Sequence, residues 1–67
     1  MSIYAVVRET IRKNDTAPGL TKAQIAAKTG SEQVATDPMV DQLVAEGLVA
    51  KTGSDPTATY LHTAKET

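Results

Sequence analysis

Apolar residues recur at helical spacing near the start of the chain. The positions i, i+3, i+4, i+7 and i+8 hold Ile3, Val6, Val7, Thr10 and Ile11. This spacing puts the five side chains on one face of an α-helix, and such a face packs against a core. The pattern predicts a helix over residues 2–14, with Ser2 placed to cap its first turn.

A second helix is indicated by the residues at its two ends. Thr21 precedes an apolar run and Gln24 follows three residues later, which is the spacing of a capping box. Leu20 and Ile25 then stand where a hydrophobic staple forms. Gly30 suits the left-handed conformation that closes a helix. We expect a helix over residues 22–29, which is too short to be stable unless it packs on other elements.

Pro38 decides the prediction for the third helix. Inside a helix, proline removes a hydrogen bond and costs about 3 kcal/mol, whereas at the first helical position it fits well. Asp37, just before it, is a good N-cap residue. The sequence therefore predicts a helix over residues 38–46, closed by Gly47, with residues 31–36 as a turn. Its core-facing positions are Met39, Val40, Leu43 and Val44.

The pattern changes after Gly47. Residues 48–52 and 58–62 are rich in strand formers, and the turn-forming segment Gly53-Ser54-Asp55-Pro56 separates them. This arrangement predicts a β-hairpin after three helices, an α+β domain. We expect its core to contain Ile3, Val7, Ile11, Ile25, Val40, Leu43, Leu48 and Leu61.

The ordered motifs from the second helix to the hairpin resemble the winged helix-turn-helix family. The shared pattern is T-x-x-x-I-A-x-x-T-G, then a helix with a leucine, then E-G-L-V. Here it consists of Thr21, Ile25, Ala26, Thr29, Gly30, Leu43, Glu46, Gly47, Leu48 and Val49. The resemblance implies a small single winged-helix domain over residues 1–67, with the hairpin as the wing. It also implies a short strand at Ala17 or Leu20 that pairs with the wing.

The resemblance further implies a transcriptional regulator that binds double-stranded DNA. Base readout would then come from Gln33, Thr36 and Gln42, because glutamine can contact adenine and threonine can contact a thymine methyl group. The DNA backbone would be held at the start of the second helix and along the wing. The residues concerned are Thr21, Lys22, Lys51, Thr52, Ser54 and Thr57.

The charge distribution supports a different function. Residues 1–30 carry five basic and two acidic residues, a net charge of +3, whereas residues 31–67 carry two basic and six acidic residues, a net charge of −4. No basic residue lies between Ser31 and Gly47. Because Lys and Arg supply most of the affinity for phosphates, this balance is unusual for a DNA-reading helix. The alternative is a protein-interaction module that binds a basic protein partner, or a second copy of itself, through an acidic or apolar face.

Residue content weighs against other classes of function. The chain of 67 residues has one histidine, His62, and no cysteine, and shows no glycine-rich phosphate loop. We therefore expect no enzyme activity, no metal site and no cofactor. No apolar run approaches the roughly 18 residues of a membrane span, so we expect a cytoplasmic protein without membrane contact. Only a thin core can form in so short a chain, and dimerisation would reinforce it.

Overall fold

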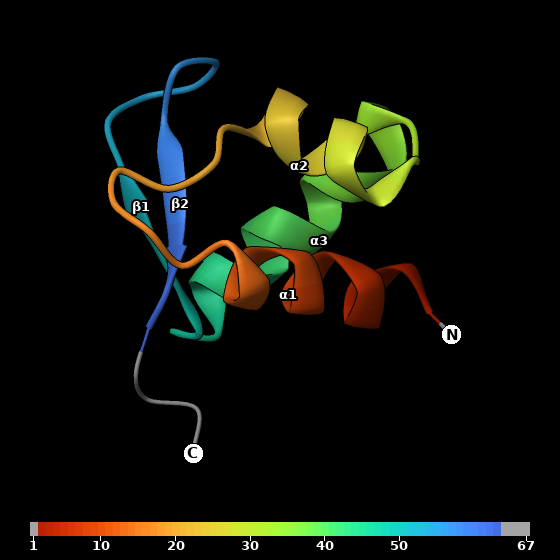
Figure 1. Ribbon diagram of the computed structural model, residues 1–67, viewed down its shortest axis with the longest axis horizontal. Coiled ribbons are helices and arrows are strands. Elements are labelled where there is room, and N and C mark those ends of the chain that lie inside the picture. Colours follow the sequence, from red (N-terminus) through yellow and green to blue (C-terminus); the bar gives the residue numbers. More distant parts are fainter. Residues whose placement is uncertain (1, 64–67) are drawn as a thin grey trace.

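The chain folds as three helices followed by a two-stranded antiparallel hairpin (Figure 1). The computed structural model describes residues 2–63. In chain order the elements are α1 (Ile3–Lys13), α2 (Lys22–Thr29), α3 (Gln33–Ala45), β1 (Val49–Thr52) and β2 (Thr59–His62). This α+β arrangement confirms the predicted fold class and has the layout of a winged helix. The ends of α1, α2, β1 and β2 agree with the prediction to within one residue.

The two first helices begin and end where local chemistry predicts. The Ser2 hydroxyl accepts the amide proton of Ala5 at the start of α1. At the start of α2, the Thr21 hydroxyl accepts from the Gln24 amide while the Gln24 side chain accepts from the Thr21 amide, which completes the capping box. Gly30 closes α2 in the left-handed conformation, with φ at +72°. These ends depend on partners within four residues, which explains why the sequence predicts them.

The third helix starts earlier than predicted. It begins at Gln33 rather than Pro38, so Pro38 lies inside α3 and Asp37 is not its N-cap. Glu32 occupies the N-cap position, and within residues 2–63 its side chain makes no capping hydrogen bond. The additional turn brings Thr36 into the core, where it is 0% exposed. Packing of this turn outweighs the local cost of the proline, because most helix stability in proteins comes from the buried face.

The core contains side chains from every element. Val7, Ile11, Ile25, Val40 and Leu43 are fully buried, as predicted, and the hairpin adds Val49, Ala58 and Tyr60. Ile3 and Leu48 are half-buried and pack against this cluster. Leu61, predicted for the core, is half-buried, whereas its neighbour Tyr60 is 0% exposed. Successive strand residues point to opposite faces, so placing Tyr60 in the core turns Leu61 to the other side of the hairpin.

The hairpin is tied to the start of α2 by a short third segment. Leu20 forms an isolated bridge with Tyr60, in which each amide donates to the other's carbonyl, at 3.2 and 2.8 Å. The pairing with the wing expected at Ala17 or Leu20 is present at Leu20, as an isolated bridge rather than a strand. Gly19 has φ at +100°, and a Cβ atom there would overlap the Tyr60 carbonyl oxygen. Glycine therefore permits both the turn and the close approach to β2.

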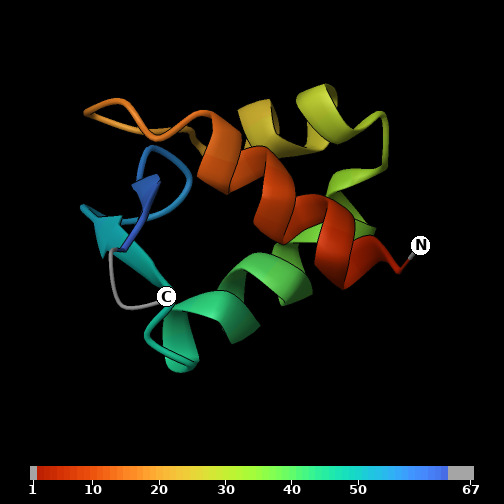
Figure 2. The ribbon, with the colours of Figure 1, turned by 60° about the horizontal axis from the view of Figure 1, so that its bottom comes forward.

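The helices gather on one side of the molecule and the hairpin lies on the other (Figure 2). The helices α1, α2 and α3 all contact one another, while β2 packs against α1 and β1 against α3. Lys51 pairs with Tyr60 across the hairpin, and β1 runs from Val49 opposite His62 to Thr52 opposite Thr59. The tip of the hairpin therefore projects away from α1, close to the start of α2 (Figure 1). No helix formed by residues 2–63 is long and apolar enough to cross a membrane.

We expect Pro38→Ala to stabilise the domain by about 1–3 kcal/mol. Proline at this position has no amide proton to donate to the Val34 carbonyl, and its ring crowds that carbonyl. Alanine removes both effects. Part of the gain in stability is lost because alanine makes the unfolded chain more flexible. Pro38 is exposed, so the substitution leaves no cavity. Urea unfolding followed by circular dichroism measures the change. An unchanged or smaller free energy of unfolding would show that the helix accommodates Pro38 without cost.

Candidate functional site

A lysine that the sequence assigns to phosphate binding is buried beneath the hairpin tip. Lys22, the first residue of α2, is only 8% exposed. Its ammonium group lies 2.8 Å from Oδ1 of Asp41 on α3 and 3.1 Å from Oδ2 of Asp55 at the hairpin tip. The same ammonium group lies 5.9 Å from the centre of the Tyr60 ring. Burial of a charge is costly unless it is paired, and here two carboxylates and an aromatic face provide the pairing.

Asp55 gathers three donors at the hairpin tip. Its Oδ2 atom accepts from both Lys22 and Lys51, at 3.1 and 3.3 Å, and its Oδ1 atom accepts from the Tyr60 hydroxyl at 2.7 Å. We call the five residues that meet here the tip cluster: Lys22, Asp41, Lys51, Asp55 and Tyr60. The cluster joins α2, α3 and both sides of the hairpin.

The contacts in the tip cluster change the proton affinities of its members. The Tyr60 hydroxyl and then the Lys22 ammonium group lower the pKa of Asp55 to about 2. Burial alone would lower the pKa of Lys22, but its hydrogen bonds to Asp41 and Asp55 outweigh burial and hold that pKa above the usual 10.5. Burial raises the pKa of Tyr60 to about 12, and its hydrogen bond to Asp55 adds to the effect. At neutral pH Lys22 is therefore charged, Asp55 is ionised and the Tyr60 phenol is protonated.

The cluster uses two residues predicted for DNA contact, and the structure changes the role of a third. Lys22 is buried and paired rather than free at the surface, which corrects its predicted availability to phosphate. Lys51 is more accessible, with 37% of its side chain exposed. Thr36 is fully buried, and its hydroxyl lies 3.5 and 3.4 Å from the carbonyl oxygens of Glu32 and Gln33. Thr36 therefore has no access to a base edge, and its predicted readout role is wrong.

The two glutamines proposed as base readers lie on opposite flanks of α3. Gln33 and Gln42 are nine residues apart, which corresponds to about two and a half turns at 3.6 residues per turn. Both are exposed, and the Gln42 amide donates to Glu46 at 3.3 Å. A single groove of DNA can therefore contact only one of the two glutamines. Gln33 lies in the first turn of α3, next to the exposed Val34.

The sequence prediction overlooks one row of side chains on α3, because it begins the helix at Pro38 instead of Gln33. Val34, Asp37, Pro38 and Asp41 follow the i, i+3, i+4, i+7 spacing of a single helix face. Val34 is 76% exposed and the Asp41 side chain is 62% exposed. With the helix predicted to begin at Pro38, Val34 fell in a turn and the row was not visible.

The remaining predicted contacts lie where expected along the hairpin and at the α2 cap. Thr52, Ser54 and Thr57 are exposed around the tip, and the Thr57 hydroxyl donates to the Ser54 carbonyl at 3.2 Å. Thr21 is half-buried, and its hydroxyl is occupied by the Gln24 amide. The three hairpin residues are therefore exposed to solvent, while Thr21 serves mainly as the helix cap.

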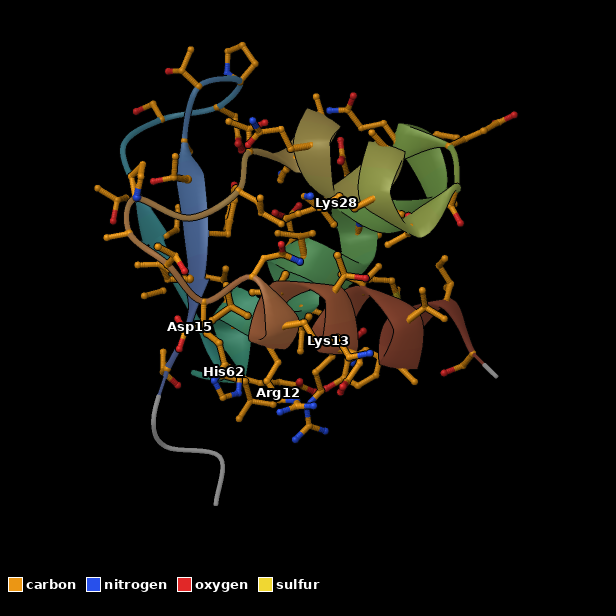
Figure 3. The ribbon with its side chains drawn as sticks, viewed as in Figure 1. Arg12, Lys13, Asp15, Lys28 and His62 are labelled. Atoms are coloured by element: carbon orange, nitrogen blue, oxygen red, sulfur yellow. The ribbon has the colours of Figure 1, made fainter. Side chains whose placement is uncertain are left out.

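Other charged groups lie away from the tip. In Figure 3, Arg12 and His62 appear at the end of the molecule opposite the hairpin tip. Arg12 donates to Glu9 in an ion pair along α1, and His62 is half-buried at the end of β2. Lys13 and Lys28 are exposed. Residues 2–63 contain no group of three or more His, Cys, Asp or Glu side chains placed to hold a metal ion, and this part of the chain forms no pocket.

Comparison with protein-family models, curated proteins and solved structures finds no match to this chain.

We expect the free energy of unfolding to fall as pH decreases from 3.8 to about 2, and Asp55→Asn to remove part of this fall. The pKa of Asp55 is depressed in the folded state, so the unfolded chain takes up the proton first and is favoured as pH decreases through this window. Urea unfolding at a series of pH values, compared between the two proteins, isolates the Asp55 contribution. If the free energy of unfolding changed with pH in the same way for both proteins, Asp55 would make no such contribution.

Proposed function

We propose that this domain binds double-stranded DNA through the hairpin tip and the start of α3, as a small transcriptional regulator. The observation that carries the proposal is the convergence of Lys22, Lys51 and the Tyr60 hydroxyl on one oxyanion. Ammonium and hydroxyl donors are the groups that proteins use to hold DNA phosphates. In the folded chain the oxyanion is the Asp55 carboxylate, which has the charge and acceptor oxygens of a phosphate contact.

The surface next to this oxyanion suits a nucleic acid backbone. Lys51 and the hydroxyls of Thr52 and Ser54 are exposed around the tip and can donate to further phosphate oxygens, whereas the Thr57 hydroxyl already donates to the Ser54 carbonyl. The winged helix-turn-helix resemblance supports the same orientation, with the hairpin against the backbone and α3 toward a groove.

Base contacts are limited to the start of α3. The exposed Gln33 amide can pair with adenine, and the exposed Val34 methyl groups can contact the methyl group of thymine. Thr36 is excluded by burial. We therefore expect modest preference for A·T base pairs and little further sequence information.

The charge of α3 makes the binding weak. Glu32 at its N-cap and Asp41 on its exposed side are acidic, and no basic residue lies on the helix. Few phosphates are neutralised, so few counterions are released and the dependence of affinity on salt is shallow.

A second candidate function is the docking of a basic protein segment on α3. The observation that favours it is Val34, 76% exposed, in one row with the carboxylate of Asp41, whose side chain is 62% exposed. An apolar side chain rimmed by polar groups marks many protein-binding surfaces, and the acidic rim suits Lys- and Arg-rich partners. This function predicts that duplex DNA is not bound.

We expect a labelled duplex to bind in a fluorescence-anisotropy titration at low salt, with affinity decreasing as salt rises. The slope of log affinity against log salt should be about −0.9 for each phosphate neutralised. Val34→Ser should reduce the preference for A·T-rich over G·C-rich duplexes while leaving affinity for random duplexes nearly unchanged. Ala35→Ser, the neighbouring exposed position on another side of α3, is the matched control and should change neither quantity.

Absence of duplex binding even at low salt, where electrostatic attraction is strongest, would reject the DNA function. The protein-docking function would then be the one supported by α3.

A further inference from the structure

We infer that Asp55 is an autoinhibitory competitor for DNA phosphate, an inference that rests on the proposed DNA function. Asp55 uses both carboxylate oxygens in the way a bound phosphate would use its own. One oxygen accepts from Lys22 and Lys51, and the other accepts from Tyr60. A phosphate at the tip therefore competes with the Asp55 carboxylate for these donors, of which Lys51 is the accessible one.

The position of Asp55 makes this competition sterically feasible. Residues 50–57 are all exposed, and 36% of the Asp55 side chain is accessible to solvent. Two of the donors, Lys22 and Tyr60, are buried, whereas the Asp55 side chain that they contact is partly exposed. Movement of the Asp55 side chain would free Lys51 and the Tyr60 hydroxyl for another acceptor.

Lys22 remains paired when Asp55 leaves. Its ammonium group keeps the shorter contact to Asp41, at 2.8 Å, compared with 3.1 Å to Asp55. A buried ammonium group with no partner would oppose the release strongly. Because Asp41 stays, Asp55 can be exchanged for another oxyanion while Lys22 is still neutralised.

The charge balance of the tip cluster explains why the competition limits affinity. With Asp55 in place, the two lysines are balanced by Asp41 and Asp55, and the cluster has no net charge to offer a phosphate. Without the Asp55 charge, the cluster has a net charge of +1. One more phosphate is then neutralised, which adds about 0.9 to the magnitude of the salt slope and about tenfold to the affinity at low salt.

The test compares wild type with Asp55→Asn in the anisotropy titration with a random-sequence duplex. Asparagine keeps the shape of the side chain and removes its charge. We expect Asp55→Asn to bind about tenfold more tightly at low salt, with a salt slope steeper by about 0.9. Adding Lys51→Ala to Asp55→Asn should abolish the gain, because Lys51 is the accessible donor that Asp55 releases.

Asp15→Asn is the matched control, because it makes the same change at an exposed carboxylate in the turn after α1, away from the hairpin tip and its lysines (Figure 3). A gain in the control equal to that of Asp55→Asn would overturn the inference in favour of a general charge effect. Equal affinity and slope for wild type and Asp55→Asn would also overturn it, while leaving the DNA function intact. Failure of both proteins to bind would reject the DNA function itself and the inference with it.

Circular dichroism establishes that each variant is folded before titration. If Asp55→Asn does not fold, Asp55→Ser takes its place, since serine also removes the charge and suits a turn. The expected gain and the outcomes that overturn the inference are the same for either variant.

Discussion

The buried ammonium group of Lys22 is the constraint on which the arrangement of this small domain depends. An ammonium group that is nearly inaccessible to water must be paired, and its partners come from α3 and from the hairpin tip. Asp41 and Asp55 meet at this ammonium group, and Asp55 brings the hairpin tip to the first turn of α2. This contact helps to position the hairpin relative to the helices from outside the apolar core.

The same residues serve both the fold and the candidate site. Tyr60 fills the core with its ring, pairs with Leu20 through its backbone, and donates to Asp55 through its hydroxyl. A domain of this size has little apolar surface to bury, so one large side chain from the hairpin contributes substantially to its stability. Site and core are consequently coupled, and substitutions at the tip are best interpreted together with a measurement of folding.

The sequence predicts the features that depend on neighbouring residues and misses those that depend on distant ones. Ser2, Thr21 and Gly30 act within a few positions of the helix ends, and their roles follow from residue type and spacing. The start of α3 was misplaced because the penalty of Pro38 is local, whereas the compensating burial of Thr36 comes from tertiary packing. Lys22 looked like a surface cation because Asp55, its partner, is 33 residues away. The expected pairing of Ala17 or Leu20 with the hairpin was the only sequence feature that pointed to the burial of Lys22. This pairing brings the start of α2 beside Tyr60.

A double-mutant cycle on Lys22 and Asp55 tests most directly whether the tip contact positions the hairpin. Lys22→Met, Asp55→Asn and the double variant are compared with wild type by urea unfolding at low salt. If the two side chains act through one another, the double variant loses less stability than the sum of the single losses. The matched cycle pairs Asp55→Asn with Lys28→Met, an exposed lysine on the same helix, and should be additive. Additivity in the Lys22 cycle as well would contradict the account, because Lys22 and Asp55 would then stabilise the domain independently.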